Sequence, residues 1–231
     1  IDSVERLEAT LATMGNLQRF RGHFYNWYDT RDLRPLDPQY VSSVDSGNLA
    51  GHLIAAANAC REWIGLPRSG AGLYAGIEDA LILARTTMQE LADDRRMQTI
   101  TRHQLAEALD ALAAVLQRDR ATAQEFAPHL EEAALLAATL VDIVRTLASE
   151  RGDDAGDEML FWAQATQRSI ESHRREFALT ADAARLLQRR LAALETTMLA
   201  MADAMEFDFL LDPERKLLSI GYQVAEGNRD S

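Results

Sequence analysis

An apolar heptad register in the last third of the chain constrains the fold most. Apolar and small side chains recur there at alternating steps of three and four residues, the spacing of a helix that packs along one seam. The register comprises Phe177, Thr180, Ala184, Leu187, Leu191, Leu194, Met198, Met201 and Met205. It predicts one long helix from about residue 158 to residue 204. Two partners fit this seam: an antiparallel helix of the same chain, which the pattern favours, or a second copy in a homodimeric coiled coil.

Most of the remaining sequence also has helical periodicity. The predicted helices cover about residues 3–19, 45–64, 74–94, 101–116 and 128–149. Asp45 is the predicted N-cap of the second helix, and Thr101 with Gln104 forms a predicted capping box. The stretches 22–43, 67–72 and 151–157 break the pattern and predict loops. A strand–turn–strand pattern over 207–222 predicts one small hairpin, so the fold class is mainly α with one β-hairpin near the C-terminus.

Composition limits the kinds of protein that this chain can be. The 231 residues, 47% of them hydrophobic, are enough for one large domain or two small ones, which excludes wholesale disorder. A net charge of −12 argues against nucleic-acid binding. The single cysteine, Cys60, excludes an internal disulfide framework. The longest nearly apolar run, Ala133 to Val141, is too short to cross a bilayer. No phosphate-binding glycine loop or zinc-type histidine pair is present, so no cofactor and no metal are expected.

The segment from Gly22 to Arg31 is the first candidate binding site. Tyr25, Trp27 and Tyr28 crowd there beside Asp29 in a non-helical stretch. Aromatic faces stack on the C–H face of a sugar ring, and amides and carboxylates hydrogen-bond its hydroxyls. A carbohydrate-binding cleft therefore fits this mixture, and so does a small aromatic core beneath a loop.

Two more segments place polar groups where a cleft can form. Asp45, Ser46 and Asn48 lie at a predicted helix start, where we expect free backbone N–H groups, although Asp45 can equally be a simple cap. Tyr222 and Glu226 follow the predicted hairpin. Acidic side chains from three such segments can form the carboxylate pair that glycoside chemistry uses.

Two blocks of this sequence resemble cyclic β-1,2-glucan synthases. Residues 22–53, GHFYNWYDTRDLRPLDPQYVSSVDSGNLAGHL, resemble a signature of the cyclisation or glycoamylase-like region, between the glycosyltransferase and phosphorylase-like modules. Residues 207–231, FDFLLDPERKLLSIGYQVAEGNRDS, resemble a second block of that region. The blocks occur in the expected order and cover under a third of the chain, and the helices between them have no residue-by-residue match.

The resemblance implies a fold and a division of the chain. The expected fold is the opening part of an (α/α)6 barrel plus a long-helix bundle. Residues 1–66 would hold the first barrel helices, 67–202 a helical bundle insertion, and 203–231 the hairpin and the next barrel segment. The chain begins without Met at Ile1, and we expect it to be a piece of a longer protein.

The resemblance also implies a function. The region would bind linear β-1,2-glucan and cyclise it by retaining transglycosylation, which needs two carboxyl groups. The expected partners are the glucan, the other synthase modules and, through the 158–204 helix, a second copy. The parent protein would lie in the bacterial inner membrane, with this segment soluble on the cytoplasmic side. A non-catalytic helical scaffold and a fragment of a β-1,2-glucan hydrolase are the alternatives.

The resemblance places the catalytic glutamates in later segments, so no residue of this chain is assigned a catalytic role. The expected substrate-binding residues are Tyr25, Trp27, Tyr28, Asp29, Asp45, Ser46, Asn48, Tyr222 and Glu226.

Overall fold

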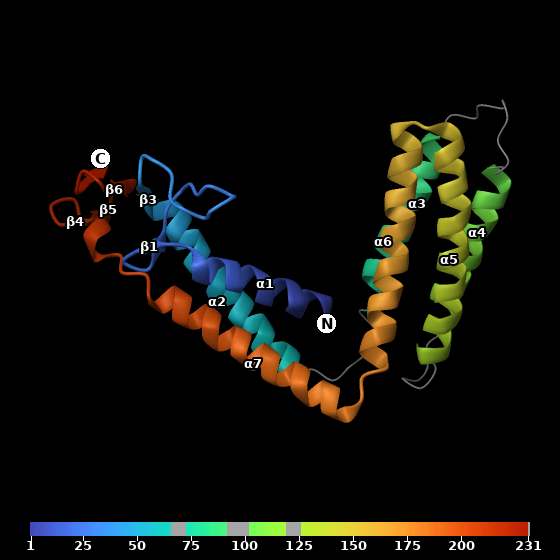
Figure 1. Cartoon of the computed structure of the whole chain (residues 1–231). Coiled ribbons are helices and arrows are strands. Elements are labelled where there is room, and N and C mark those ends of the chain that lie inside the picture. Colours follow the sequence, from blue (N-terminus) through green and yellow to red (C-terminus); the bar gives the residue numbers. More distant parts are fainter. Residues whose placement is uncertain (66–72, 92–101, 119–125, 231) are drawn as a thin grey trace. The chain divides into compact units, whose positions relative to one another are not determined.

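The computed structural model describes residues 1–65, 73–91, 102–118 and 126–230 (Figure 1). The chain forms two compact units, which are considered one at a time. The first combines Ile1–Leu66 with Ala181–Ser231, and the second is Pro67–Thr180. The sequence-based division placed the bundle at 67–202. The observed second unit ends earlier because the last helix packs with the N-terminal segment.

Three helices, α1 (Asp2–Asn16), α2 (Ser43–Gly65) and α7 (Ala181–Asp203), form the helical part of the first unit. Helices α2 and α7 run antiparallel, side by side (Figure 1). Their facing side chains make one apolar core of Val4, Leu11, Leu53, Ala57, Cys60, Leu191, Leu194, Met198, Met201, Ala202 and Met205. The C-terminal part of the heptad seam is therefore covered within the same chain, by α2 and α1.

The predicted helix over 158–204 is wrong in one respect, because it is two helices. Helix α6 (Asp154–Phe177) ends at Ala178, whose N–H donates to the Arg174 carbonyl oxygen. Thr180 directly precedes α7, at a position where threonine favours a new helix start. The heptad register therefore continues through a helix break: Phe177 packs on the core of the second unit, whereas Leu187 packs on that of the first.

The first unit also carries three small antiparallel sheets, where the sequence predicted one hairpin. Strands β1 (Arg19–Phe20) and β2 (His23–Phe24) pair, and so do β4 (Leu211–Asp212) and β5 (Leu217–Leu218). The third sheet has the order β3 (Tyr40–Ser42), β6 (Gly221–Gln223) and β7 (Asn228–Asp230). Residues 208–210, predicted as strand, form the short 3-10 helix η3 (Asp208–Leu210).

Pairing of β3 with β6 joins the two blocks that carry the family resemblance. Tyr40 lies opposite Gln223, and Ser42 lies opposite Gly221. Such pairing between residues far apart in sequence has no local signal. The N-terminal and C-terminal segments of the first unit are thus joined by a sheet as well as by helix packing.

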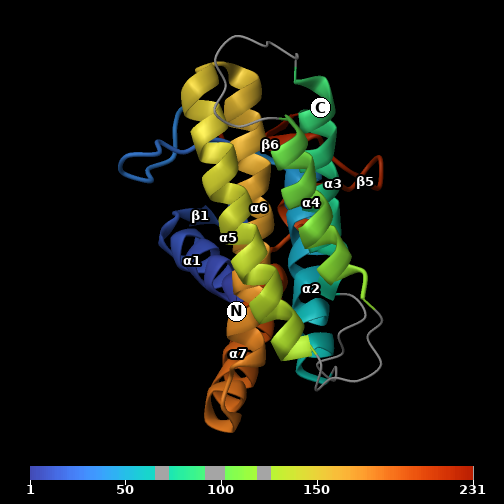
Figure 2. The same ribbon diagram turned by 90° about the vertical axis from the view of Figure 1, so that its right-hand side faces the viewer.

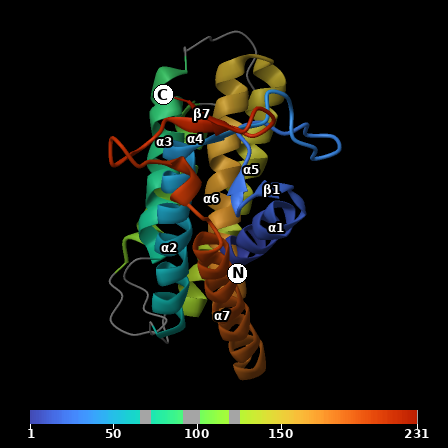
Figure 3. The same ribbon diagram turned by 90° about the vertical axis from the view of Figure 1, so that its left-hand side faces the viewer.

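The described part of the second unit is a bundle of α3 (Leu73–Glu90), α4 (Arg102–Leu116), α5 (Phe126–Arg151) and α6 (Figures 2 and 3). Its core is aliphatic, with Ile77, Leu109, Leu112, Leu140, Met159 and Ile170 fully buried. Asp153 caps α6 by accepting the Gly156 N–H, so the loop predicted over 151–157 is shorter than expected. The predicted cap at Thr101 and the end of the helix predicted over 74–94 lie outside the described residues.

The mainly α fold class is confirmed: the helices form two groups, and the strands of the described residues belong to the first unit. The (α/α)6 barrel remains a prediction. Among the described residues, no helix combines the length and the apolar character that crossing a bilayer requires.

Candidate functional site

The first two candidate segments meet at an open cavity of about 490 Å³ in the first unit. One wall is the end of β2 and the loop after it, and the other is the first two turns of α2. The lining residues are Phe24, Tyr25, Asn26, Trp27, Asp45, Ser46 and Leu49. Four of the nine sequence-predicted site residues are therefore brought together.

Hydrogen bonds fix the two walls relative to each other. The Asn26 N–H donates to the Tyr40 carbonyl oxygen, and the Asn26 Oδ1 accepts the Ser42 N–H at 3.2 Å. The Ser43 hydroxyl and N–H both donate to the Ile220 carbonyl oxygen, at 2.9 and 3.0 Å. The segment that closes the chain thereby holds the start of α2 in place.

The predicted N-cap of α2 is wrong by three residues. Ser42 Oγ accepts the Asp45 N–H at 3.1 Å, so Ser42 is the cap and Asp45 lies in the first turn. Ser46 and Asn48 consequently lie inside the helix, where backbone N–H groups bond to preceding carbonyls. The open helix end that the sequence predicted at these residues is absent from this described segment. The carboxylate of Asp45 is instead left for other contacts.

Four cavity residues have groups available to a ligand. Trp27 is 48% exposed, and its indole ring lies 6.5 Å from the Tyr40 ring at a tilt of 33°. Asp45 is exposed, and its carboxylate has no partner among the described residues. Tyr25 and Ser46 are only 6% and 5% exposed, yet their hydroxyls also have no hydrogen-bond partner in the described part of the chain. Burial raises the pKa of Tyr25, which keeps its phenol protonated.

Two other predicted site residues have local structural contacts, and a third lies outside the cavity. The Tyr28 hydroxyl accepts the Tyr25 N–H at 2.9 Å and donates to the Gln18 carbonyl oxygen at 2.7 Å. The Asp29 carboxylate accepts the Arg31 N–H within a turn. Asn48 is exposed and is not among the residues that line the cavity.

The last two predicted residues, Tyr222 and Glu226, lie away from this cavity. Tyr222 stacks on Phe20 with ring centroids 5.6 Å apart and meets the edge of Phe209. Glu226 is exposed in the turn between β6 and β7, where it accepts a hydrogen bond from the Asn228 amide. Tyr222 thus belongs to a small aromatic core, and neither residue lines the cavity.

His23 is a buried titratable group that sequence patterns did not single out. It is fully buried between the edges of Phe207 and Phe209, and Nε2 lies 2.8 Å from the Glu206 carbonyl oxygen. Nδ1 has no partner in the described part of the chain. Burial lowers the pKa of His23, although its bond to Glu206 partly opposes this effect. The neutral form, with the proton on Nε2, fits these contacts.

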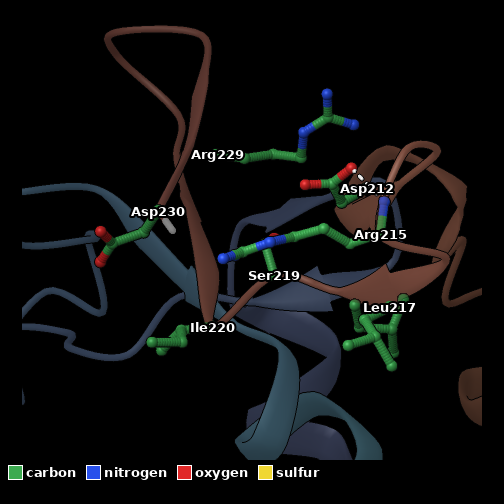
Figure 4. A pocket seen from close by; sticks show the side chains of 8 residues that line it. Asp212, Arg215, Leu217, Ser219, Ile220, Arg229 and Asp230 are labelled. Atoms are coloured by element: carbon green, nitrogen blue, oxygen red, sulfur yellow. Dashed lines mark hydrogen bonds between the residues drawn. The ribbon is translucent and has the colours of Figure 1, made fainter.

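A second cavity, of about 180 Å³, lies between the β4–β5 hairpin, the two residues that follow it, Ser219 and Ile220, and strand β7 (Figure 4). Its polar groups are largely engaged within the chain. Asp212 Oδ1 accepts the N–H groups of Glu214 and Arg215, and its pKa is lowered chiefly by the Arg215 N–H. Arg229 donates to the Leu211 carbonyl oxygen, and Asp230 accepts the Tyr40 hydroxyl. These contacts describe two hairpins packed together.

Comparison with known proteins identifies a relative of the whole chain. No protein-family model matches it. Over 99% of its length, the chain is 38% identical to the cyclic β-(1,2)-glucan synthase NdvB of Rhizobium meliloti (strain 1021). The chain is a relative of one segment of this synthase. It spans 8% of the synthase's length. The resemblance read from two blocks is confirmed, and it extends over the helices between them, where no match had been recognised.

Proposed function

We propose that the first unit supplies a binding site for linear β-1,2-glucan within a carbohydrate-active synthase. The observation that carries the proposal is the cavity where Trp27 and Asp45 lie together. A half-exposed indole offers a face for the C–H surface of a glucose ring, and a carboxylate without a partner accepts hydrogen bonds from two neighbouring hydroxyls. The homology to a glucan synthase supports a glucan as the ligand.

Within the synthase, this site would hold the glucan for cyclisation by retaining transglycosylation. That reaction uses two carboxyl groups about 5–5.5 Å apart. Asp45 is the carboxylate that lines the described cavity, whereas Asp29 closes a turn and Glu226 lies in the β6–β7 turn. We therefore assign glucan binding to this unit and the catalytic carboxyl pair to other parts of the synthase.

A scaffold role is the second candidate, and it concerns the second unit. Its helices bury a continuous aliphatic core, as expected of a module that positions its neighbours. Binding in the first unit and spacing by the second are compatible within one synthase. A substitution confined to the cavity, with both units kept in the chain, tests glucan binding by the first unit separately from spacing by the second.

The test compares two tryptophans of nearly equal exposure on the same unit. Trp27 is 48% exposed at the cavity, and Trp63 is 46% exposed near the other end of α2. Trp27→Ala should weaken binding of linear β-1,2-glucan about fivefold to thirtyfold in isothermal titration calorimetry, since a stacking contact is worth about 1–2 kcal/mol. Trp63→Ala should leave binding unchanged. Equal affinities for the two variants and the wild-type chain would contradict the proposal.

A further inference from the structure

Exposed aliphatic side chains gather on the β4–β5 hairpin and the residues directly after it. Leu211 is 42% exposed, Leu217 66%, Leu218 49% and Ile220 62%. Val44, at the start of α2, is 63% exposed. We propose that these five residues, the apolar hairpin surface, dock this chain on a segment of the synthase that lies outside it and presents an apolar, uncharged surface. This docking role is separate from glucan binding and does not depend on it.

Backbone hydrogen bonds bring Val44 beside the hairpin. The Ser43 hydroxyl and N–H both donate to the Ile220 carbonyl oxygen, at 2.9 and 3.0 Å, so the residue after Ser43 lies close to Ile220 in space. In Figure 4, the Leu217 and Ile220 side chains extend away from the Arg229 guanidinium group. Hydrophobic residues exposed singly are common on protein surfaces, but several gathered in one place mark an interaction site.

The hairpin is held together without these aliphatic side chains. The Ser219 N–H and hydroxyl both donate to the Leu210 carbonyl oxygen, at 2.8 and 3.0 Å. The Lys216 N–H donates to the Asp212 carbonyl oxygen at 2.8 Å. Leu210 is fully buried at the base of the hairpin. The exposed side chains are therefore not needed for the hairpin to fold, and the apolar hairpin surface is formed before a partner contacts it.

Two other occupants fit this surface less well. A second copy would bring together two chains of net charge −12, and a large net charge keeps proteins monomeric. A membrane surface attracts segments rich in lysine and arginine. Residues 211–220 instead contain two acidic side chains, Asp212 and Glu214, and two basic ones, Arg215 and Lys216, so their charges cancel. Neither a second copy nor an anionic membrane is favoured electrostatically.

The length of the related synthase provides the remaining occupant. The chain spans 8% of that protein, so most of the synthase lies outside the matched segment. Stable complexes of separate proteins use about 20–30 residues on each side, far more than the apolar hairpin surface contains. Segments of one polypeptide meet at a high effective concentration, so a small contact is enough to hold them together. A small, neutral and apolar surface therefore fits a contact within the synthase.

Thiol labelling measures whether this surface is covered. Leu217→Cys and Leu218→Cys place a thiol on it, and Leu186→Cys, at a 57% exposed position of α7, is the control. The native Cys60 is buried, and burial raises the pKa of its thiol, so it stays unlabelled in the folded chain and reports folding. Each variant is prepared as the 231-residue chain and as a Rhizobium meliloti synthase in which this chain replaces the homologous segment.

In the isolated chain, the three introduced thiols should react with N-ethylmaleimide at similar rates, measured by peptide mass spectrometry. In the synthase, the rates for Leu217→Cys and Leu218→Cys should fall about tenfold or more relative to the control, because a covered thiol is inaccessible to the reagent. If Cys60 reacts there, the inserted chain is unfolded. The rates are then measured on the isolated chain mixed with the synthase lacking that segment, with the same result expected.

Equal rates at the hairpin and control positions in the synthase, or in that mixture, overturn the proposal. Slow labelling of the hairpin thiols in the isolated chain also overturns it. Slow labelling that depends on chain concentration assigns the surface to a second copy, and slow labelling that requires phosphatidylglycerol vesicles assigns it to a membrane. If neither condition matters, another part of the same chain covers the hairpin.

Discussion

Replacement of Gly22 by alanine tests how the first unit is assembled. Gly22 lies in the turn between β1 and β2 with φ of 82°, in the left-handed region that glycine tolerates best. An added Cβ would lie 1.8 Å from the Ala204 carbonyl oxygen and 2.8 Å from the Met205 nitrogen. Both atoms are backbone atoms at the end of α7. The turn therefore packs directly on the helix end, with no space for a methyl group.

The expected loss combines two effects. A residue other than glycine in the left-handed region costs about 1–2 kcal/mol, and forcing atoms into packed structure costs about 1–3 kcal/mol more. We expect Gly22→Ala to destabilise the first unit by about 3 kcal/mol, which lowers its Tm by roughly 10 °C. Thermal unfolding followed by tryptophan fluorescence measures the change, because Trp27 and Trp63 both belong to this unit.

Gly227→Ala is the matched control. Gly227 also has a positive φ, of 70°, but its added Cβ would meet only the Tyr222 hydroxyl, at an ordinary 3.9 Å. This variant should show the conformational cost alone, about 1–2 kcal/mol. If Gly22→Ala were no more destabilising than Gly227→Ala, the β1–β2 turn would not pack on α7 as described.

Three further predictions concern stability. Between pH 7 and pH 5 the first unit should lose up to about 1.4 kcal/mol of unfolding free energy per pH unit, because the lowered pKa of His23 lets the unfolded chain take up a proton near pH 6.5 before the folded chain does. Urea unfolding at several pH values should show a weaker dependence of the unfolding free energy on pH for His23→Gln, and an unchanged dependence would refute this. Gly51→Ala should stabilise α2 by about 0.5–1 kcal/mol, since its Cβ would meet no atom within 4 Å; a lower Tm would contradict this. Ser42→Ala should cost about 1 kcal/mol through the lost cap in urea unfolding, and no loss would mean that another residue caps α2.

Helix periodicity predicted where most helices lie, but not where each helix begins and ends. The seam from Leu187 to Met205 packs inside the chain because its spacing records a buried face directly. The same spacing passes through the break at Ala178, so the pattern alone does not show that two helices stand where one was predicted. The cap at Ser42 was missed because Asp45 is an equally good cap by residue type.

The candidate site divides in the same way. One cavity is lined by four of the predicted site residues, Tyr25, Trp27, Asp45 and Ser46. The sequence indicated the elements that carry them, a non-helical stretch over 22–43 and a helix that starts near residue 45. The roles of the other residues depend on partners that composition does not reveal. The Tyr28 hydroxyl bonds to Gln18, ten residues away. Pairing of β3 with β6 places the C-terminal segment beside the start of α2 and Tyr222 on the aromatic core. No local sequence pattern encodes that pairing.

Nuclear magnetic resonance of the indole N–H groups tests the glucan site most directly. The chain has three tryptophans, of which Trp27 lies at the cavity, Trp63 lies near the end of α2 and Trp162 belongs to the second unit. With the three resonances assigned by single Trp→Phe variants, linear β-1,2-glucan is titrated into the labelled chain. We predict that the Trp27 resonance shifts in a saturable manner while those of Trp63 and Trp162 stay in place. A Trp27 resonance that stays in place at saturating glucan would contradict the site described above.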